Sequence, residues 1–214
     1  MALKGRMGRI ILNVSFLALD ISLFLYLGFP SSSGTIGSKQ PSHVSSLQAT
    51  EIDNEAGIVS SVSFEDSLVL PIVQQPQGET NYVSSNAGEV TQFSSASQYG
   101  NVGLLAHNFL SGKSFSHLIV GQEIHLQYED GNIENFVVTE ILSYQALDPR
   151  NPFSSFQNLN NKKEVLSAQE MFERVYEGNH HITFQTCIAR NGVSSWGRLF
   201  VVAVPEVPSL SIAP

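Results

Sequence analysis

The stretch that decides the fold is Ile182–Val204, which reads I-T-F-Q-T-C-I-A-R-N-G-V-S-S-W-G-R-L-F-V-V-A-V. Residues 182–188 are rich in β-branched and aromatic side chains, and Leu199–Val204 is a continuous apolar run. Between the two segments, Asn191-Gly192 supplies residues that are typical of turns. The stretch therefore predicts two short strands joined by a loop.

The only cysteine of the chain, Cys187, ends the first of these strands, and Arg198 opens the second. Neighbouring antiparallel strands lie about 5 Å apart, so the two side chains can share a site. The thiolate is the reactive form of cysteine, and a nearby guanidinium favours it. The alternative is a buried free cysteine that packs as a small hydrophobe. The two residues alone leave a reactive thiol and a structural cysteine as open alternatives.

The segment Thr183-Phe184-Gln185-Thr186-Cys187, followed by Arg198, resembles the T-L-x-T-C strand and downstream arginine of the sortases. Sortases are cysteine transpeptidases that attach proteins to bacterial cell envelopes. The resemblance covers about residues 62–205, and it implies a sortase-like closed β-barrel with short helices.

A second motif lies upstream, where residues 100–108 read G-N-V-G-L-L-A-H-N. The pattern predicts a turn and a buried strand that ends at His107. On its own, His107 fits a hydrogen-bonded structural histidine as well as a functional one. Its place matches the histidine of the sortases, which ends an apolar strand ahead of the T-L-x-T-C strand, although Ala106 stands where those proteins often have glycine.

The resemblance implies a role for each of these residues. Cys187 is expected to be the nucleophile, His107 the general acid and base, and Arg198 the group that holds the substrate and stabilises the oxyanion. The residues that flank the histidine and the cysteine are expected to bind substrate: Ala106, Asn108 and Thr186.

The implied reaction begins with cleavage of an L-P-x-T-G-like sorting signal in exported proteins, through a thioester on Cys187. The acyl group then passes to an amine acceptor, which in this family is a cell-wall precursor or a pilin lysine. One alternative is a thiol peptidase that releases the acyl group to water. Another is a catalytically silent sortase-like domain that binds peptides.

No cofactor and no metal ion are expected. A metal site formed by His107, His180 and His181 is disfavoured, because adjacent residues of a strand point to opposite faces. No set of carboxylates or cysteines completes such a site.

The composition limits the other classes of function. The chain has 214 residues, which suits one folded domain with accessory segments. Its formal net charge is −8 and its pI is about 5.1, which argues against a nucleic acid partner because no basic cluster is present to neutralise phosphates. A single cysteine excludes an intramolecular disulfide.

The N-terminal part predicts a membrane anchor. Residues 1–9 contain three basic side chains, and residues 10–29 form an apolar run long enough to cross the roughly 30 Å core of a bilayer. Basic residues ahead of the run predict a cytoplasmic N-terminus and an extracellular domain in a single-pass membrane protein. A cleaved signal peptide is the alternative, but this run is longer than usual, and residues 28–31, G-F-P-S, make a poor cleavage site.

Residues 30–61 are rich in Ser, Gly, Thr and Gln and predict a flexible spacer, which leaves residues 62–205 as the catalytic domain and residues 206–214 as a tail. The domain reads as all-β, with Asp130-Gly131 as a hairpin turn. One amphipathic segment, Lys162–Tyr176, predicts a helix that packs on the barrel. This helix lies within Asp148–Asn179, which corresponds to the loop that recognises the sorting signal in sortases. The candidate strands are Leu68–Val73, Val102–Ala106, Glu123–Tyr128, Asn135–Leu142, Ile182–Ile188 and Arg198–Val204.

Overall fold

The structure of the chain is a computed structural model that describes residues 58–64, 68–79, 81–151 and 153–206. The predicted anchor at residues 10–29, almost all of the predicted spacer and the predicted tail lie outside these residues. Within the described residues, no helix is both long and apolar enough to cross a membrane.

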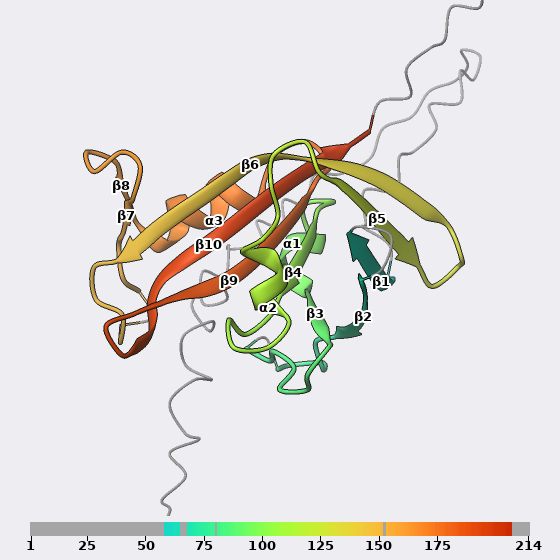
Figure 1. Cartoon of the computed structure of the whole chain (residues 1–214), viewed down its shortest axis with the longest axis horizontal. Coiled ribbons are helices and arrows are strands. Elements are labelled where there is room, and N and C mark those ends of the chain that lie inside the picture. Colours follow the sequence, from blue (N-terminus) through green and yellow to red (C-terminus); the bar gives the residue numbers. More distant parts are fainter. Residues whose placement is uncertain (1–57, 65–67, 80, 152, 207–214) are drawn as a thin grey trace, which may run out of the picture.

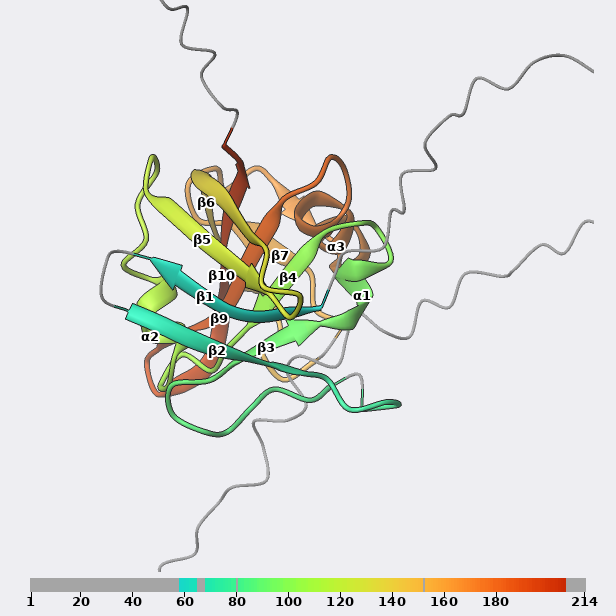
Figure 2. The ribbon, with the colours of Figure 1, turned by 90° about the vertical axis from the view of Figure 1, so that its right-hand side faces the viewer.

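Eight strands pair side by side and close into a mixed β-barrel (Figures 1 and 2). Their order is β10-β9-β4-β3-β2-β1-β5-β6, and pairing of β10 with β6 closes the ring. The β2–β3 and β4–β9 pairs are parallel, and the others are antiparallel. The strands are β1 (Val59–Phe64), β2 (Leu68–Gln74), β3 (Val90–Phe93), β4 (Val102–Leu105), β5 (Glu123–Tyr128), β6 (Ile133–Ala146), β9 (Ile182–Arg190) and β10 (Val193–Pro205).

The remaining elements are two short strands and three helices that are not part of the closed barrel. Strands β7 (Phe156–Asn158) and β8 (Val165–Leu166) extend the sheet outward from the end of β6. Helix α3 (Ala168–Tyr176) lies on the outer face of the sheet (Figure 1). The short helices α1 (Ser94–Ser97) and α2 (Gly112–Phe115) follow β3 and β4.

Side-chain alternation along the strands divides the buried apolar residues into two clusters. The inner cluster takes residues from all eight barrel strands, for example Ile182 and Phe184 from β9, and it fills the barrel. The outer cluster lies between the sheet and α3 and includes Leu105, Tyr144 and Phe200. Most large side chains of both clusters are fully buried, so successive residues of a barrel strand face the barrel interior and the outer layer in turn.

The closed barrel with short helices agrees with the predicted fold class. All six predicted strands are present, and the Asp130-Gly131 hairpin is confirmed, with Gly131 at a φ of 88°. Strands β1, β3 and β7 were not predicted, because β1 reads V-S-S-V-S-F with small polar side chains and β3 and β7 have only 4 and 3 residues. The predicted spacer 30–61 is wrong at its end, where residues 59–61 belong to β1.

The predicted helix Lys162–Tyr176 is wrong over its first part, where Val165–Leu166 forms a strand that pairs with β7. Helix α3 begins only after Ser167. The Ser167 hydroxyl accepts a bond from Glu170 N, and the Glu170 carboxylate accepts one from Ser167 N, which forms a capping box. The prediction that the apolar stripe of this helix packs on the barrel is confirmed, because Met171, Val175 and Tyr176 belong to the outer cluster.

Candidate active site

Cys187 and Arg198 are direct partners across the antiparallel β9–β10 pair. Residues that face each other in this way have Cβ atoms about 4.5–5.5 Å apart and present their side chains on the same face of the sheet. The pairing therefore brings together the thiol and the guanidinium that the sequence analysis expected to share a site.

His107 follows β4, which runs parallel to β9 on the side away from β10. Each residue of β4 pairs with the residue of β9 that lies 80 positions later in the sequence, as Leu105 pairs with Gln185. The contact continues beyond the end of β4, since Ala106 N donates to Gln185 O at 3.2 Å and Thr186 Oγ1 donates to Ala106 O at 2.8 Å. The same register places His107 beside Cys187.

The three residues also share one face of the sheet. Ala106 belongs to the inner cluster, so the next residue, His107, turns outward as Leu105 does. Arg198 lies two residues before Phe200, which belongs to the outer cluster. His107, Cys187 and Arg198 thus form a row across β4, β9 and β10, with the cysteine in the middle.

Arg198 is a buried cation, with only 5% of its surface exposed. Its Nη1 donates to Ser195 O and to Gly197 O, both at 3.1 Å, and its guanidinium lies 5.9 Å from the centre of the Phe156 ring. Carbonyl acceptors on its own strand and the Phe156 ring on β7 therefore hold the side chain in place. Arg198 is therefore not a solvated side chain at the edge of the sheet.

Arg190 has different surroundings. Its side chain is exposed, and its guanidinium lies 4.9 Å from the centre of the Trp196 ring across the β9–β10 turn. Of the two arginines near the cysteine in sequence, only Arg198 is a direct cross-strand partner of Cys187.

His107 is 9% exposed, and its ring stacks on Phe109 with centroids 5.2 Å apart and planes 15° apart. Burial lowers the pKa of His107, and a hydrogen bond with the backbone of Val83 partly opposes this effect. The imidazole is therefore neutral at neutral pH and can accept a proton. The next residue, Asn108, donates through Nδ2 to Ser194 O at 3.2 Å, which ties the histidine segment to the β9–β10 turn.

Replacing His107 with glutamine should make the free energy of unfolding less sensitive to acid. An unfolded histidine takes up its proton near pH 6.5, whereas burial lowers the pKa of His107 in the folded protein. As the pH falls through the unfolded value, the unfolded chain binds more protons than the folded one, so the wild type loses stability. The loss is complete once the pH is below the lowered pKa of the folded state.

Chemical denaturation of the two proteins between about pH 8 and pH 5 measures this difference. His125, which is half-buried and hydrogen-bonded to Asn135, offers a control in His125→Gln. An equal response to acid in the wild type and in His107→Gln would contradict the prediction.

The residues expected to bind substrate make contacts within the protein. Thr186 is 4% exposed, and its hydroxyl binds Ala106 O. The side chain of Ala106 packs in the inner cluster, and Asn108 binds Ser194 O. Their contact with substrate stays a prediction.

Sequence reasoning missed Phe109 and Phe156, the two rings that contact His107 and Arg198. For Phe109 a signal exists, because an aromatic residue two positions after a histidine at a strand end can reach its ring. For Phe156 no such signal exists, since the contact with Arg198 depends on the pairing of β6 with both β7 and β10.

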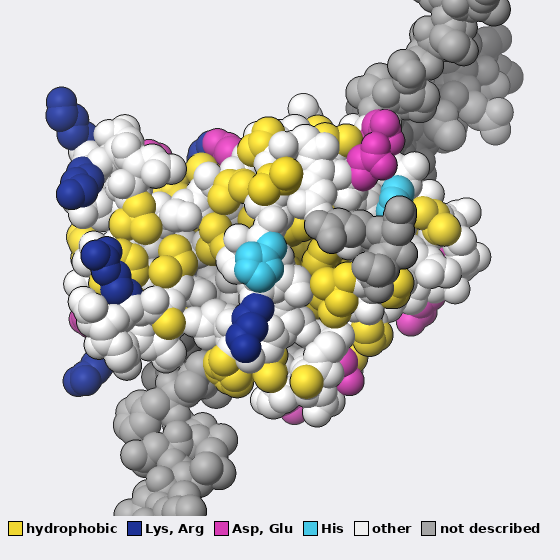
Figure 3. All heavy atoms as spheres, viewed as in Figure 1, with side chains coloured by type: hydrophobic (Ala, Val, Ile, Leu, Met, Phe, Trp, Pro, Cys, Tyr) yellow, Lys and Arg dark blue, Asp and Glu magenta, His cyan; other side chains and the backbone are white. Residues whose placement is uncertain are grey.

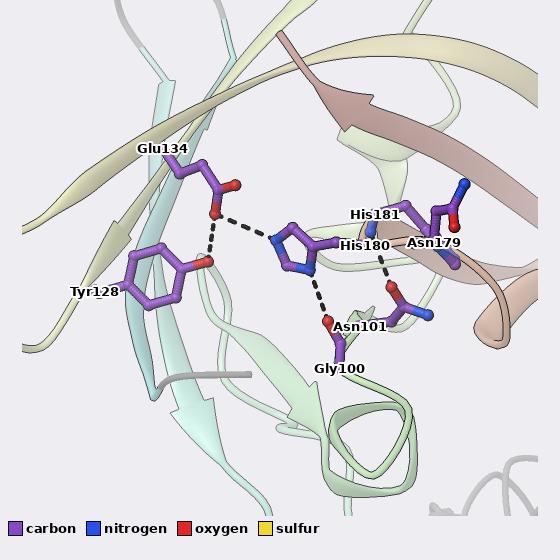
Figure 4. Close-up of polar contacts among 7 residues, drawn as sticks. All are labelled: Gly100, Asn101, Tyr128, Glu134, Asn179, His180 and His181. Atoms are coloured by element: carbon purple, nitrogen blue, oxygen red, sulfur yellow. Dashed lines mark hydrogen bonds and ion pairs between the residues drawn. The ribbon is translucent and has the colours of Figure 1, made fainter. Parts of the chain in front are cut away.

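The two histidines ahead of β9 have separate partners. His180 lies between Gly100 O, 2.6 Å from its Nδ1, and the Glu134 carboxylate, 3.3 Å from its Nε2 (Figure 4). The nitrogens of His181 lie 2.7 Å from Asn179 O and 3.0 Å from Val175 O. In the part of the chain that the structure describes, no group of three or more His, Cys, Asp or Glu could hold a metal ion.

The surface around the site is partly apolar. Figure 3 shows exposed apolar side chains scattered over one face of the molecule, and basic side chains along its left edge. Phe109 is 51% exposed beside His107, and Leu147 and Phe153 are exposed in the segment between β6 and β7. That segment is joined to the β9–β10 hairpin through the Ser195 hydroxyl, which donates to Pro149 O at 3.2 Å. An exposed ring thus borders His107, and further exposed apolar side chains lie in the segment that is joined to the β9–β10 hairpin.

The fold was compared with solved structures. Sortases are among the solved structures that this chain resembles. Sortase A from Corynebacterium diphtheriae is 13% identical, with a TM-score of 0.47 over 73% of this chain and 64% of that one. Sortase E1 from Streptomyces coelicolor is 16% identical, with a TM-score of 0.45 over 72% of this chain and 90% of that one. Sortase C from Clostridium perfringens SM101 is 14% identical, with a TM-score of 0.43 over 72% of each chain. No family model matches the sequence, and no curated protein matches it.

Proposed function

We propose that this protein is a sortase-like cysteine transpeptidase that acts on an L-P-x-T-G-like sorting signal of exported proteins. The observation that carries the proposal is the row of His107, Cys187 and Arg198 across three neighbouring strands. A thiol between an imidazole and a buried guanidinium has the groups that acyl transfer requires. The T-F-Q-T-C segment and its downstream arginine support the same function.

In the proposed reaction, neutral His107 accepts the proton of the Cys187 thiol as the sulfur attacks the carbonyl carbon of the scissile peptide bond. Arg198 stabilises the negative charge that develops on the carbonyl oxygen. Protonated His107 then donates its proton to the leaving amine, the C–N bond breaks, and an acyl thioester on Cys187 remains. An incoming amine attacks the thioester, His107 accepts its proton, and the new amide leaves as the thiol is restored.

The proposal is tested by incubating the protein with a library of sorting-signal peptides and an amine acceptor. Mass spectrometry should detect an acyl adduct on Cys187 and an amide product that contains the acceptor. A thiol peptidase gives the same adduct, but its product is the free acid whether or not the amine is present. A silent peptide-binding domain binds peptides and forms no adduct.

We also propose that residues 10–29 anchor the protein in the membrane, that the polar residues between the anchor and β1, which begins at Val59, form a spacer, and that the catalytic domain lies outside the cell. The support is the order of basic residues, apolar run and polar spacer in the sequence. The partners are then exported proteins with a C-terminal sorting signal and an amine from a cell-wall precursor or a pilin lysine.

Protease added to cells without their wall should remove the domain and leave a short membrane-bound fragment. A cytosolic protein serves as the control for intact cells. A domain that stays protected, or a protein that is released after cleavage near residue 31, contradicts the proposed anchor.

A further inference from the structure

Helix α2 starts directly against the end of β4, which leads to His107, and against Thr186 of β9, the residue before Cys187. Its first residue, Gly112, is buried and donates its N–H to His107 O at 3.1 Å. Leu110 N donates to the same carbonyl at 2.9 Å. The backbone of His107 is thus held from one side by the segment that enters α2.

A side chain has no room at position 112. A Cβ there would overlap the Thr186 hydroxyl and would lie 2.7 Å from His107 O and 2.8 Å from Ala106 O. Two of these three atoms belong to the backbone and cannot turn aside as a flexible side chain can. Only glycine allows this close approach.

The three crowded atoms belong to one connected unit. Thr186, the residue before Cys187, donates its hydroxyl to Ala106 O at 2.8 Å, and Ala106 precedes His107. This bond links Thr186, within β9, to Ala106, the residue that follows β4, and Gly112 lies against both residues. A displacement of α2 would therefore be transmitted to the spacing between His107 and Cys187.

We infer that Gly112 is a positioning residue for the proposed reaction: by letting α2 seat against Ala106, His107 and Thr186, it keeps the histidine in register with the cysteine. The inference rests on the proposed function and adds a residue to it. A misplacement of about 1 Å in a reacting pair can cost roughly 10²-fold in rate, so a small shift of the β4 end is sufficient for a large effect.

The test compares Gly112→Ala with the wild type in the full chain. The first measurement is the rate at which iodoacetamide alkylates Cys187 as a function of pH, which reports the pairing of the thiol with His107 and needs no substrate. We expect the pH dependence of the alkylation rate in Gly112→Ala to become the same as in His107→Gln. The second measurement is peptide turnover, in which kcat should fall by roughly 10²-fold while KM changes little.

Two control variants separate positioning from general damage. Gly103→Ala also crowds a buried glycine, with Phe93 Cβ at 2.9 Å, but it contacts the outer cluster away from the cysteine. It should lower the midpoint of thermal unfolding and leave the alkylation profile unchanged. Ser111→Ala alters the neighbouring residue, whose buried hydroxyl has no hydrogen-bond partner among the described residues, and it should match the wild type in both measurements.

A further variant, Thr186→Ala, covers the case in which Gly112→Ala does not fold. It adds no atoms, removes the bond to Ala106 O, and should move the alkylation profile in the same direction. A wild-type profile in folded Gly112→Ala, or in folded Thr186→Ala, overturns the inference. If the wild type forms no acyl adduct while the profile of Gly112→Ala still moves, the proposed reaction fails and the positioning role stands.

Discussion

Cys187→Ala should abolish both the acyl adduct and peptide turnover while the barrel stays folded. Loss of the nucleophile in a comparable covalent mechanism lowers kcat by about 10⁶-fold, so residual turnover should not be detectable. Cys187 lies at the middle of the row and is partly exposed. Replacing it with alanine removes only the sulfur atom, so little buried volume is lost. Turnover of the sorting-signal peptide and the unfolding midpoint, measured on the same preparation, check both parts of the prediction.

Alkylation of the native protein distinguishes a reactive thiol from a structural cysteine. The reagent should modify Cys187 without denaturant, and activity should disappear in step with labelling. Ser60→Ala is a suitable control, because this residue lies in β1, which three strands separate from β9 in the order of the barrel. If labelling requires denaturant, Cys187 is a structural cysteine and not a reactive thiol.

Arg198→Lys should lower turnover by about 10²–10³-fold, the usual effect of losing one oxyanion donor. Lysine keeps the charge, but it cannot reproduce the planar guanidinium that donates to two carbonyls and lies near the Phe156 ring. Arg198→Ala should lose at least as much activity. It should also lower the free energy of unfolding by about 1–3 kcal/mol, because the buried carbonyls of Ser195 and Gly197 lose a donor.

Arg190→Ala is the matched control for this experiment. Arg190 is exposed and contacts Trp196, so its removal should cost no more than about 0.5–1 kcal/mol in stability and leave turnover close to that of the wild type. If Arg190→Ala is the damaging change and Arg198→Lys is silent, the cation has been assigned to the wrong arginine.

Local sequence patterns account for most of the strands. Period-two alternation marked β5, and an Asp-Gly pair marked the turn into β6, because both signals depend on neighbouring residues. The same kind of pattern failed at Lys162–Tyr176. There a helical spacing of apolar residues included Val165–Leu166, which pairs with β7 through contacts that the local sequence does not encode.

The candidate site likewise has some features that the local sequence encodes and others that depend on tertiary structure. The residues themselves predict a cysteine at the end of a strand, an arginine at the start of the next strand, and a histidine after an apolar strand. The first two positions are wrong, because β9 continues to Arg190 and β10 begins at Val193, so Cys187 and Arg198 lie within their strands. A hairpin brings its own strands together, so the pairing of Cys187 with Arg198 is encoded within a short stretch of chain. The outcomes of the tests above decide whether these groups react.

The position of His107 and the support around the site depend on tertiary structure. His107 is 80 residues from Cys187, and only the parallel β4–β9 pair sets their register. The burial of Arg198, the ring of Phe156 beside it and the close fit of Gly112 against Thr186 all arise where distant segments pack together. Local propensity acts over a few residues, whereas register, burial and close approach are properties of the closed barrel, so only the folded chain could decide them.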